Sequence, residues 1–353
     1  MENTTSARPS LGAIKRKSVG AAQTEWIKTG MLLPDKSMPL LVQPAIDGID
    51  LKEWAKANRP FIEENLLKYG AVLFRGFAIK AISEFEEIIG VMSDSGAIEY
   101  TFRASPRSRV EGHVYTSTDY PADQPIFPHN EHSYSPVFPL RIFFYSVIPA
   151  EEGGETPIGD CRRIFKRIPA EIVERFKQKR VMYVRNYADG FGLPWRAVFQ
   201  TEDRAEVEAY CLERGIATEW ISDEHLRTRQ SGPAVVKHPR TGESCWFNHA
   251  TFFHITTLPP VLRDGMLAQF KEENLPTQTY YGDGSPIEHD ILEVLRDCYR
   301  QEMVDFPWQK GDFLAVDNML AVHARNPYKG ARKTVVGMAE PTTWKDVQIE
   351  GVA

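Results

Sequence analysis

The chain has 353 residues, of which 42% are hydrophobic and 25% are charged, and this balance is typical of a globular protein. Its formal net charge of −6 at pH 7 argues against a nucleic-acid binder that works through a broad basic surface. Apolar runs are too short to cross a membrane, and the polar N-terminus lacks the apolar segment of a secretory signal, so we expect a cytoplasmic protein.

Helix and strand signals alternate at the start of the chain. Residues 1–25 are polar and are expected to form a flexible tail. Residues 50–68 carry apolar side chains at roughly helical spacing, and Pro60 is predicted to interrupt or kink that helix. The β-rich run YGAVLFRGF at 69–77 predicts a strand, and a second helix is expected at about 80–92.

A long loop region at 94–126 is rich in Ser, Pro, Asp and Gly, and its length suggests a lid over a site. The segment 186–200, which contains two glycines and a tryptophan, is a second candidate lid. Between them, FPHNEHSYSP at 127–136 has flanks typical of a buried strand. The run PLRIFFYSVIP at 139–149 predicts a core strand, and EEGGETPIGD at 151–160 predicts a turn.

The rest of the chain mixes helices with short strands. Helical patterns are found at about 169–178, 203–214, 259–273 and 287–300. Short strands are predicted at about 180–187, 233–238, 244–248, 312–316, 320–324 and 333–338. We find no internal repeat and no evident linker, so we predict one α+β domain over 26–353, mainly β, with helices flanking a β-rich core.

The motif His129-Asn130-Glu131-His132 offers three metal-binding side chains in four positions. In a strand, residues i and i+2 project from one face, so His129 and Glu131 would point together and Asn130 and His132 would point the other way. An Fe(II) site of the two-histidine, one-carboxylate type needs one further histidine and leaves coordination positions open. This triplet alone is weak evidence, because such triplets often arise by chance.

A second candidate region is WQKGDFLAVDNMLAVHARNPYKGARK at 308–333. Its two apolar strands and the tight turn at Asp317 and Asn318 predict a hairpin that brings His323 back into the core of the sheet. A histidine on an apolar strand is by itself more often a core residue than a ligand. Arg332 has a permanent charge and a forked guanidinium that suits a carboxylate.

Taken together, HxE, GGETP and GDFLAVDNMLAVHARNPYKGARK resemble the TauD/TfdA superfamily of Fe(II)/2-oxoglutarate-dependent oxygenases. More narrowly, the chain is similar to the branch that contains clavaminate synthase and the SyrP-like hydroxylases. Supporting stretches are YGAVLFRGF, VYTSTDYPADQPIFPHNE and CWFNHATFFH, so the resemblance extends over about 69–340. It implies a double-stranded β-helix (jelly roll) core, with helices outside and a long insertion between Glu131 and His323.

The resemblance also implies the site. The family's metal ligands fall on His129, Glu131 and His323, and its 2-oxoglutarate-binding arginine and threonine fall on Arg332 and Thr156. The implied cofactors are Fe(II), 2-oxoglutarate and O2, with ascorbate as a reductant in vitro. Glutamate at the carboxylate position matches clavaminate synthase, whereas most relatives use aspartate. A filled carboxylate position favours hydroxylation or desaturation, because related halogenases leave that position open for chloride.

The sequence says less about the residues that would contact the substrate. Sulfonate and aryloxyalkanoate degraders in the superfamily carry a second arginine where this chain has Val336, which disfavours a taurine-like substrate. His132, His249 and His254 are expected to be structural residues. Arg325 could pair with an acid or contact 2-oxoglutarate. The candidate substrate contacts are Asn130, Trp246, Asn248 and Arg325.

The resemblance implies hydroxylation of an unactivated C–H bond of an amino acid or amino-acid-derived metabolite, in secondary metabolism. The substrate could be free or tethered to a carrier protein, for which Arg103, Arg107 and Arg109 would form a basic patch unless they are ordinary loop residues. Neither a nucleic acid nor a membrane is expected as a partner, and a homo-oligomer is compatible with the sequence. The alternatives are a desaturase or cyclase of the same family, a zinc-dependent hydrolase and a non-catalytic metal-binding jelly roll.

Overall fold

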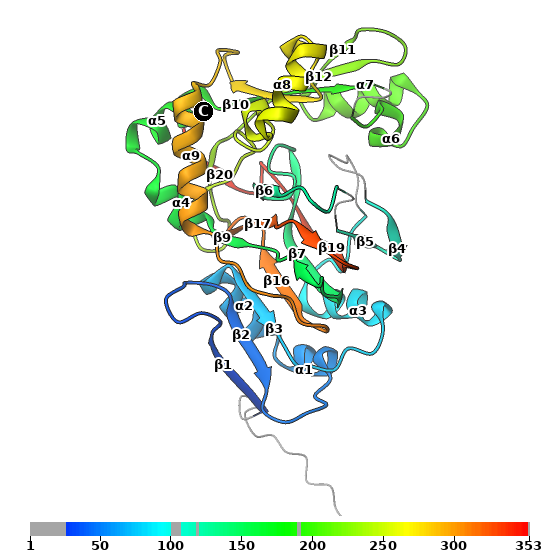
Figure 1. The fold of residues 1–353 in the computed structure, drawn as a ribbon, viewed down its shortest axis with the longest axis vertical. Helices are drawn as coiled ribbons and strands as arrows, with labels where there is room; N and C mark the ends of the chain where they lie inside the picture. Colours follow the sequence, from blue (N-terminus) through cyan, green and yellow to red (C-terminus); the bar gives the residue numbers. More distant parts are fainter. Residues whose placement is uncertain (1–25, 100–106, 118–119, 189–191, 352–353) are drawn as a thin grey trace, which may run out of the picture.

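A large mixed sheet forms the centre of the molecule (Figure 1). The computed structural model describes residues 26–99, 107–117, 120–188 and 192–351. Only β2 and β3 are parallel neighbours in the sheet; its other neighbouring strands are antiparallel. In spatial order its eight strands are β1 (Ile27–Met31), β2 (Leu40–Pro44), β3 (Ala71–Phe74), β16 (Phe313–Asp317), β7 (Val137–Ile148), β19 (Lys333–Thr343), β5 (Val114–Thr116) and β4 (Arg109–Glu111).

A smaller antiparallel sheet packs against one face of this large sheet. It consists of β6 (Ile126–His129), β17 (Ala321–Arg325) and β9 (Ile158–Asp160). Strands of both sheets contribute to one buried apolar cluster, including Phe144 and Leu314 from the large sheet and Ile158 and Ala321 from the small one. The expected jelly-roll core with helices outside is therefore confirmed.

Three helices cover the opposite face of the large sheet, as Figure 1 shows. They are α1 (Leu51–Ala57), α2 (Arg59–Tyr69) and α3 (Ile82–Met92). Because side chains alternate along a strand, Phe143 and Phe313 face these helices, whereas their neighbours Phe144 and Leu314 face the small sheet. The predicted interruption at Pro60 is confirmed, since the proline stands in the first turn of α2, where its missing N–H is tolerated.

The long segment between β9 and β16 builds the upper part of the molecule in Figure 1. Its four-stranded sheet contains β11 (Ala217–Trp220), β12 (Leu226–Gly232), β10 (Val181–Tyr187) and β15 (Thr277–Tyr281). Minor pairings involve β14 (Ser244–Trp246), β13 (Val235–Lys237), β20 (Gln348–Ile349), β18 (Tyr328–Lys329) and β8 (Glu152–Gly153). The helices are α4 (Cys161–Arg167), α5 (Ala170–Lys179), α6 (Trp195–Phe199), α7 (Arg204–Glu213), η2 (Ile255–Thr257), α8 (Pro260–Gln269), η3 (Glu272–Asn274) and α9 (His289–Glu302).

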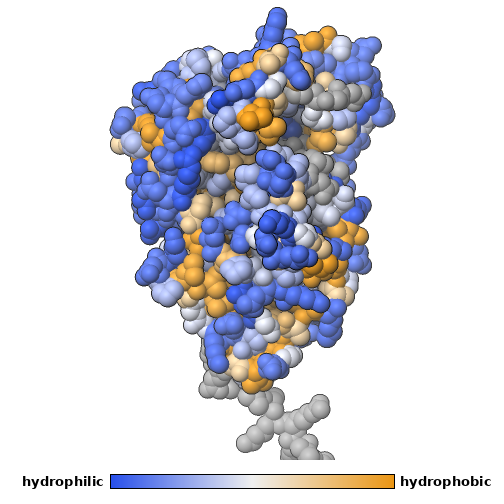
Figure 2. Space-filling model, in the orientation of Figure 1, coloured by the Kyte–Doolittle hydropathy of each residue, from blue (hydrophilic) through white to orange (hydrophobic). Residues whose placement is uncertain are grey.

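The face of the molecule in Figure 2 is largely hydrophilic, with small and separate apolar areas. Helix α8 buries none of its residues, and its Val261 and Leu262 are exposed. Scattered exposed apolar side chains of this kind are ordinary on a protein surface. Among the described residues, no helix combines the length and the apolar character that a membrane span requires.

The predicted hairpin between β16 and β17 is wrong. Strand β16 pairs with β3 and β7 in the large sheet, whereas β17 pairs with β6 and β9 in the small one. The turn between them therefore carries the chain from one sheet to the other. Asp317 stabilises this turn, because its Oδ1 accepts hydrogen bonds from the backbone N–H groups of Met319 (3.0 Å) and Leu320 (3.1 Å).

Replacing Asp317 with asparagine should lower the free energy of unfolding by about 3 kcal/mol, because it breaks a buried ion pair. Asp317 and Arg141 are both fully buried and paired, and His238 Nε2 lies 3.0 Å from Asp317 Oδ2. Burial would raise the pKa of Asp317, but Arg141 and His238 outweigh it and hold the pKa at about 2. Urea denaturation at pH 7 measures the loss.

The exposed Asp264 gives a matched control, since Asp264→Asn should change the unfolding free energy by less than about 0.5 kcal/mol. Because the pKa of Asp317 is depressed, its contribution is complete above the unfolded-state pKa of about 4 and is lost as the pH falls towards 2. Equal stabilities of wild type and Asp317→Asn at pH 7 would contradict this account.

Candidate metal centre and its cavity

His129 is the last residue of β6, and the chain fixes the orientation of its ring. Its Nδ1 lies 2.9 Å from the carbonyl oxygen of Phe127, to which it donates a hydrogen bond, so the lone pair of Nε2 is left for a metal. The ring also stacks on Phe252, with 4.4 Å between centroids and an angle of 29°. His129 is therefore held as an Nε2 ligand.

Glu131 does not lie on a strand, so the predicted alternation of faces over 129–132 is wrong. Strand β6 ends at His129, the following residues form a turn, and His132 has a φ of 56°, in the left-handed region. The turn arises from contacts far along the chain. The side-chain amide of Asn318 accepts from the Glu131 N–H (2.7 Å) and donates to the Glu131 carbonyl oxygen (2.8 Å).

A second set of hydrogen bonds joins the turn that contains Glu131 to the turn that contains Asn318. Asn130 Nδ2 donates to the carbonyl oxygens of Asn318 (2.6 Å) and Ala321 (3.3 Å). Both asparagines are fully buried. Asn130 and Asn318 together fix Glu131 relative to the strand that carries His323, and the expected substrate contact of Asn130 stays a prediction.

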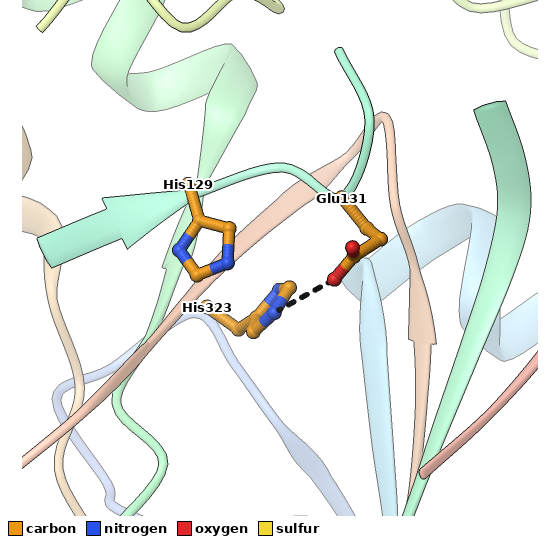
Figure 3. Close-up of side chains that lie close together, drawn as sticks. All are labelled: His129, Glu131 and His323. Atoms are coloured by element: carbon orange, nitrogen blue, oxygen red, sulfur yellow. Dashed lines mark ion pairs between the residues drawn. The ribbon is translucent and has the colours of Figure 1, made fainter. Parts of the chain in front are cut away.

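His323 lies in the middle of β17, directly opposite His129 in the antiparallel register. One ligand atom each from His129, Glu131 and His323 can be chosen so that all three lie within 4.8 Å of one another. Figure 3 shows the two imidazoles and the carboxylate converging, with 4.0 Å between His323 Nε2 and Glu131 Oε2. Two imidazoles and one carboxylate fit the donor set of a mononuclear Fe(II) site.

The protonation states of the three side chains suit a metal. Burial is the main cause that lowers the pKa of His129 and, to a greater extent, that of His323, so both rings are neutral at pH 7. Burial would raise the pKa of Glu131, but the charge of Arg107 outweighs it, and the pKa is about 2. Neutral imidazoles and an ionised carboxylate are the forms that coordinate a cation.

A cavity beside the triad contains both residues expected to bind 2-oxoglutarate. Arg332 donates from Nε to the Gly154 carbonyl oxygen (2.9 Å) and from Nη1 to the Ser117 hydroxyl (3.2 Å). Burial and the neighbouring Arg325 lower the pKa of Arg332 to about 10, so it is charged at pH 7. The cavity is lined by Arg107, Ser117, Ile126, His129, Phe144, Thr156, His323, Ala324, Arg325, Arg332 and Thr334.

The Thr156 hydroxyl accepts a hydrogen bond from the protein, which leaves its hydrogen free to be donated. Trp308 Nε1, which can only donate, lies 3.1 Å from Thr156 Oγ1, so the threonine oxygen is the acceptor. The hydroxyl hydrogen is then available to an acceptor in the cavity. A charged guanidinium and a hydroxyl in one buried cavity suit a carboxylate.

Arg325 lines the cavity, but its guanidinium is engaged with the protein. It donates to the carbonyl oxygens of Tyr120 (3.0 Å), Pro121 (2.6 Å) and Gln124 (2.8 Å). Neither an acidic partner nor a 2-oxoglutarate contact is needed to explain its position. Arg325 therefore holds the loop that precedes β6 against the cavity.

Two further expected substrate contacts lie outside this cavity. Trp246 is fully buried and packs edge-on against Phe176, with 5.2 Å between ring centroids. Asn248 Nδ2 donates to the carbonyl oxygen of Ala234 (3.0 Å), and its Oδ1 accepts from the Ala250 N–H (2.9 Å). Both residues are buried in the core, and their expected place on the substrate side stays a prediction.

Arg107 is the residue that sequence reasoning placed wrongly. The sequence is compatible with a place for Arg107 in a basic surface patch. In the structure Arg107 is buried, and its Nη2 lies 2.7 Å from Glu131 Oε2. Arg109 is exposed, and Arg103 lies outside the described residues. Parts of both candidate lids, 94–126 and 186–200, also lie outside them, so the lid roles stay predictions. The sequence offered no local signal for Arg107, since its partner lies 24 positions away.

Comparisons with known proteins identify the family of this chain. The family model "Taurine catabolism dioxygenase TauD, TfdA family" matches residues 35–339. The dapdiamide synthesis protein DdaC of Enterobacter agglomerans is 40% identical over 280 residues, 79% of this chain and 85% of DdaC. A clavaminate synthase-like protein of Arabidopsis thaliana is 28% identical over 325 residues, 87% of this chain and 92% of the plant protein.

Solved structures share the fold. PvcB of Pseudomonas aeruginosa superposes with a TM-score of 0.55 at 14% sequence identity, over 94% of this chain and 96% of PvcB. PvcB is described as an Fe, alpha-ketoglutarate dependent oxygenase from an isonitrile synthetic pathway. At this level of identity the superposition shows the fold alone.

Proposed function

The chain belongs to the TauD, TfdA family of dioxygenases, and from that premise we propose that it hydroxylates an unactivated C–H bond with Fe(II) and 2-oxoglutarate. The observation that carries the proposal is the placement of His129, Glu131 and His323 beside one cavity that also contains Arg332 and Thr156. A metal triad alone would suit several chemistries. The charged guanidinium and the hydroxyl in the same cavity favour a dicarboxylate cosubstrate.

Each part of the site has a distinct task. His129, Glu131 and His323 would hold Fe(II), and Arg332 and Thr156 would hold the 5-carboxylate of 2-oxoglutarate. Iron and 2-oxoglutarate supply the oxidising power, with O2 as the oxidant and succinate and CO2 as the products of the cosubstrate. The chain would position the reactants: Arg332 and Thr156 would fix the 5-carboxylate end of the cosubstrate, and burial keeps the metal-binding side chains in their coordinating forms.

The zinc hydrolase alternative is weaker. A hydrolytic zinc site needs three ligands and an activated water, and it has no use for Arg332 or Thr156. The same two residues also have no function in a jelly roll that keeps a metal only as a structural support. Their presence in the cavity with the triad therefore supports the oxygenase.

The proposed substrate is an amino acid or amino-acid-derived metabolite of secondary metabolism. The support is the similarity to DdaC, which is named for dapdiamide synthesis. Hydroxylation or desaturation is preferred to halogenation because Glu131 fills the carboxylate position. Desaturation or ring closure would use the same site.

A product screen tests the proposal. The purified protein is incubated with Fe(II), ascorbate, 2-oxoglutarate and O2, together with amino acids offered free or loaded on a phosphopantetheinylated carrier protein. We expect one substrate to gain one oxygen atom by mass spectrometry while an equivalent amount of succinate forms. A loss of two hydrogens instead would indicate desaturation or cyclisation. Turnover of ester or amide substrates with zinc, without use of 2-oxoglutarate, would overturn the oxygenase.

A further inference from the structure

The Glu131 carboxylate has a nitrogen-bearing side chain next to each of its two oxygens. Arg107 Nη2 lies 2.7 Å from Glu131 Oε2, and only 4% and 6% of the two side chains are exposed. His132 Nε2 faces the other oxygen, Oε1, at 3.6 Å. Of these two neighbours, Arg107 lies within hydrogen-bond distance of the carboxylate, and its guanidinium carries a permanent charge.

The oxygen that Arg107 holds is the one that points towards the second histidine. Glu131 Oε2 lies 4.0 Å from His323 Nε2, and this distance leaves room for a cation between them. A carboxylate oxygen has two lone pairs, so Oε2 can accept from Arg107 and still offer a lone pair to a metal. The contact thus supports coordination rather than blocking it.

A glutamate ligand benefits more than an aspartate ligand from a hydrogen-bond partner that fixes its carboxylate. Its side chain has one more rotatable bond than that of aspartate, and holding it in one conformation costs conformational entropy each time a metal binds. Asn318 fixes only the backbone of Glu131, through the N–H and the carbonyl oxygen. The orientation of the carboxylate itself depends on the contact with Arg107.

We propose that Arg107 is a positioning residue that keeps the Glu131 carboxylate turned towards His129 and His323 before the metal binds. This inference rests on the proposed function, because it assigns the metal to that triad. Arg107 also lines the cavity beside the triad, so the residue that orients Glu131 forms part of the cavity wall. Hydrogen-bond partners of metal ligands typically contribute 10- to 100-fold to metal affinity.

Metal binding without turnover tests the proposal. Apoprotein is titrated with Co(II), and the visible d–d absorption reports both affinity and coordination. Arg107→Gln should weaken Co(II) binding about 10- to 100-fold and alter the absorption spectrum, because the carboxylate is no longer oriented. Arg107→Lys should recover part of the affinity, since it restores the charge but not the fork. Arg109→Gln, at an exposed position two residues further on, should bind Co(II) as the wild type does.

A double-mutant cycle separates positioning from a general effect on folding. In a Glu131→Ala background, adding Arg107→Gln should change Co(II) affinity by less than twofold, because the residue through which Arg107 acts is gone. If Arg107→Gln does not fold, the same cycle is made with Arg107→Lys. Equal Co(II) affinity and spectrum of wild type and the Arg107 variant, or an unchanged effect without Glu131, would overturn the proposal. A wild type that binds neither Co(II) nor Fe(II) would instead overturn the proposed function.

Discussion

His323→Ala should lower metal affinity by more than about 100-fold, and turnover of 2-oxoglutarate should fall to background. A direct ligand contributes more than a hydrogen-bond partner of a ligand, for which losses of about 10- to 100-fold are usual. His323 is buried in the middle of β17 opposite His129, so a solvent molecule cannot easily be arranged to replace its imidazole in the same geometry. Titration with Mn(II), followed by electron paramagnetic resonance, and succinate formation measure the two losses.

The exposed His289 provides the control for a lost imidazole. His289→Ala should retain both metal affinity and turnover. Thermal unfolding of the metal-free proteins shows whether His323→Ala keeps the fold. A folded His323→Ala variant that binds Mn(II) with wild-type affinity would remove His323 from the metal centre.

Arg332→Gln should raise the dissociation constant for 2-oxoglutarate roughly 30- to 150-fold and leave metal affinity unchanged. A buried hydrogen bond to a charged group contributes about 2–3 kcal/mol, and each 1.4 kcal/mol is a factor of ten. Arg332 lies in the cavity wall, and its guanidinium donates hydrogen bonds to Gly154 and Ser117 rather than to the triad. Calorimetric titration of the Mn(II)-loaded protein with 2-oxoglutarate under anaerobic conditions measures the change.

Two variants sharpen this prediction. Arg332→Lys should recover part of the affinity, because an ammonium keeps the charge but cannot form the two parallel hydrogen bonds of a guanidinium. Lys333→Gln changes the next residue along the chain. Lys333 lines a second pocket next to the triad cavity but does not line the triad cavity itself, so this variant should bind 2-oxoglutarate as the wild type does. Equal weakening by Lys333→Gln and Arg332→Gln would mean that only the overall positive charge matters.

Much of the fold could be predicted because its signals are local. Helical spacing predicted α3, α5, α7, α8 and α9, and apolar runs predicted the central strands β7 and β16. The break between α1 and α2 followed from one proline. The triad was found because its residue types carry chemical information at short spacing and because the motifs on both sides resemble a family.

The local geometry of the triad could not be predicted, because distant contacts decide it. Strand alternation would place Glu131 beside His129, and the structure does bring them together, but through a turn. That turn depends on hydrogen bonds between Asn130 and Asn318, which are 188 positions apart. Distant contacts also decide the β16–β17 connection. The chain changes sheets there because β16 and β17 pair with strands of two different sheets.

Side-chain roles were the least predictable. A loop without periodicity gives no information on burial, so the sequence favours a surface position for Arg107, whereas the structure pairs it with Glu131. Trp246 and Asn248 were placed near the substrate because their segment resembles one that lies near the site in relatives. Their own hydrogen bonds and packing assign them to the core.

We infer that the triad, Arg332 and Thr156 form one site for Fe(II) and 2-oxoglutarate. Anaerobic addition of 2-oxoglutarate to the Fe(II)-loaded protein tests it most directly, because chelation of Fe(II) by a 2-oxo acid produces a visible charge-transfer band. We predict a band that saturates at one equivalent of each component, is absent with zinc, is lost in His323→Ala and needs more 2-oxoglutarate in Arg332→Gln. Iron that binds stoichiometrically without producing any band on addition of 2-oxoglutarate would contradict the account.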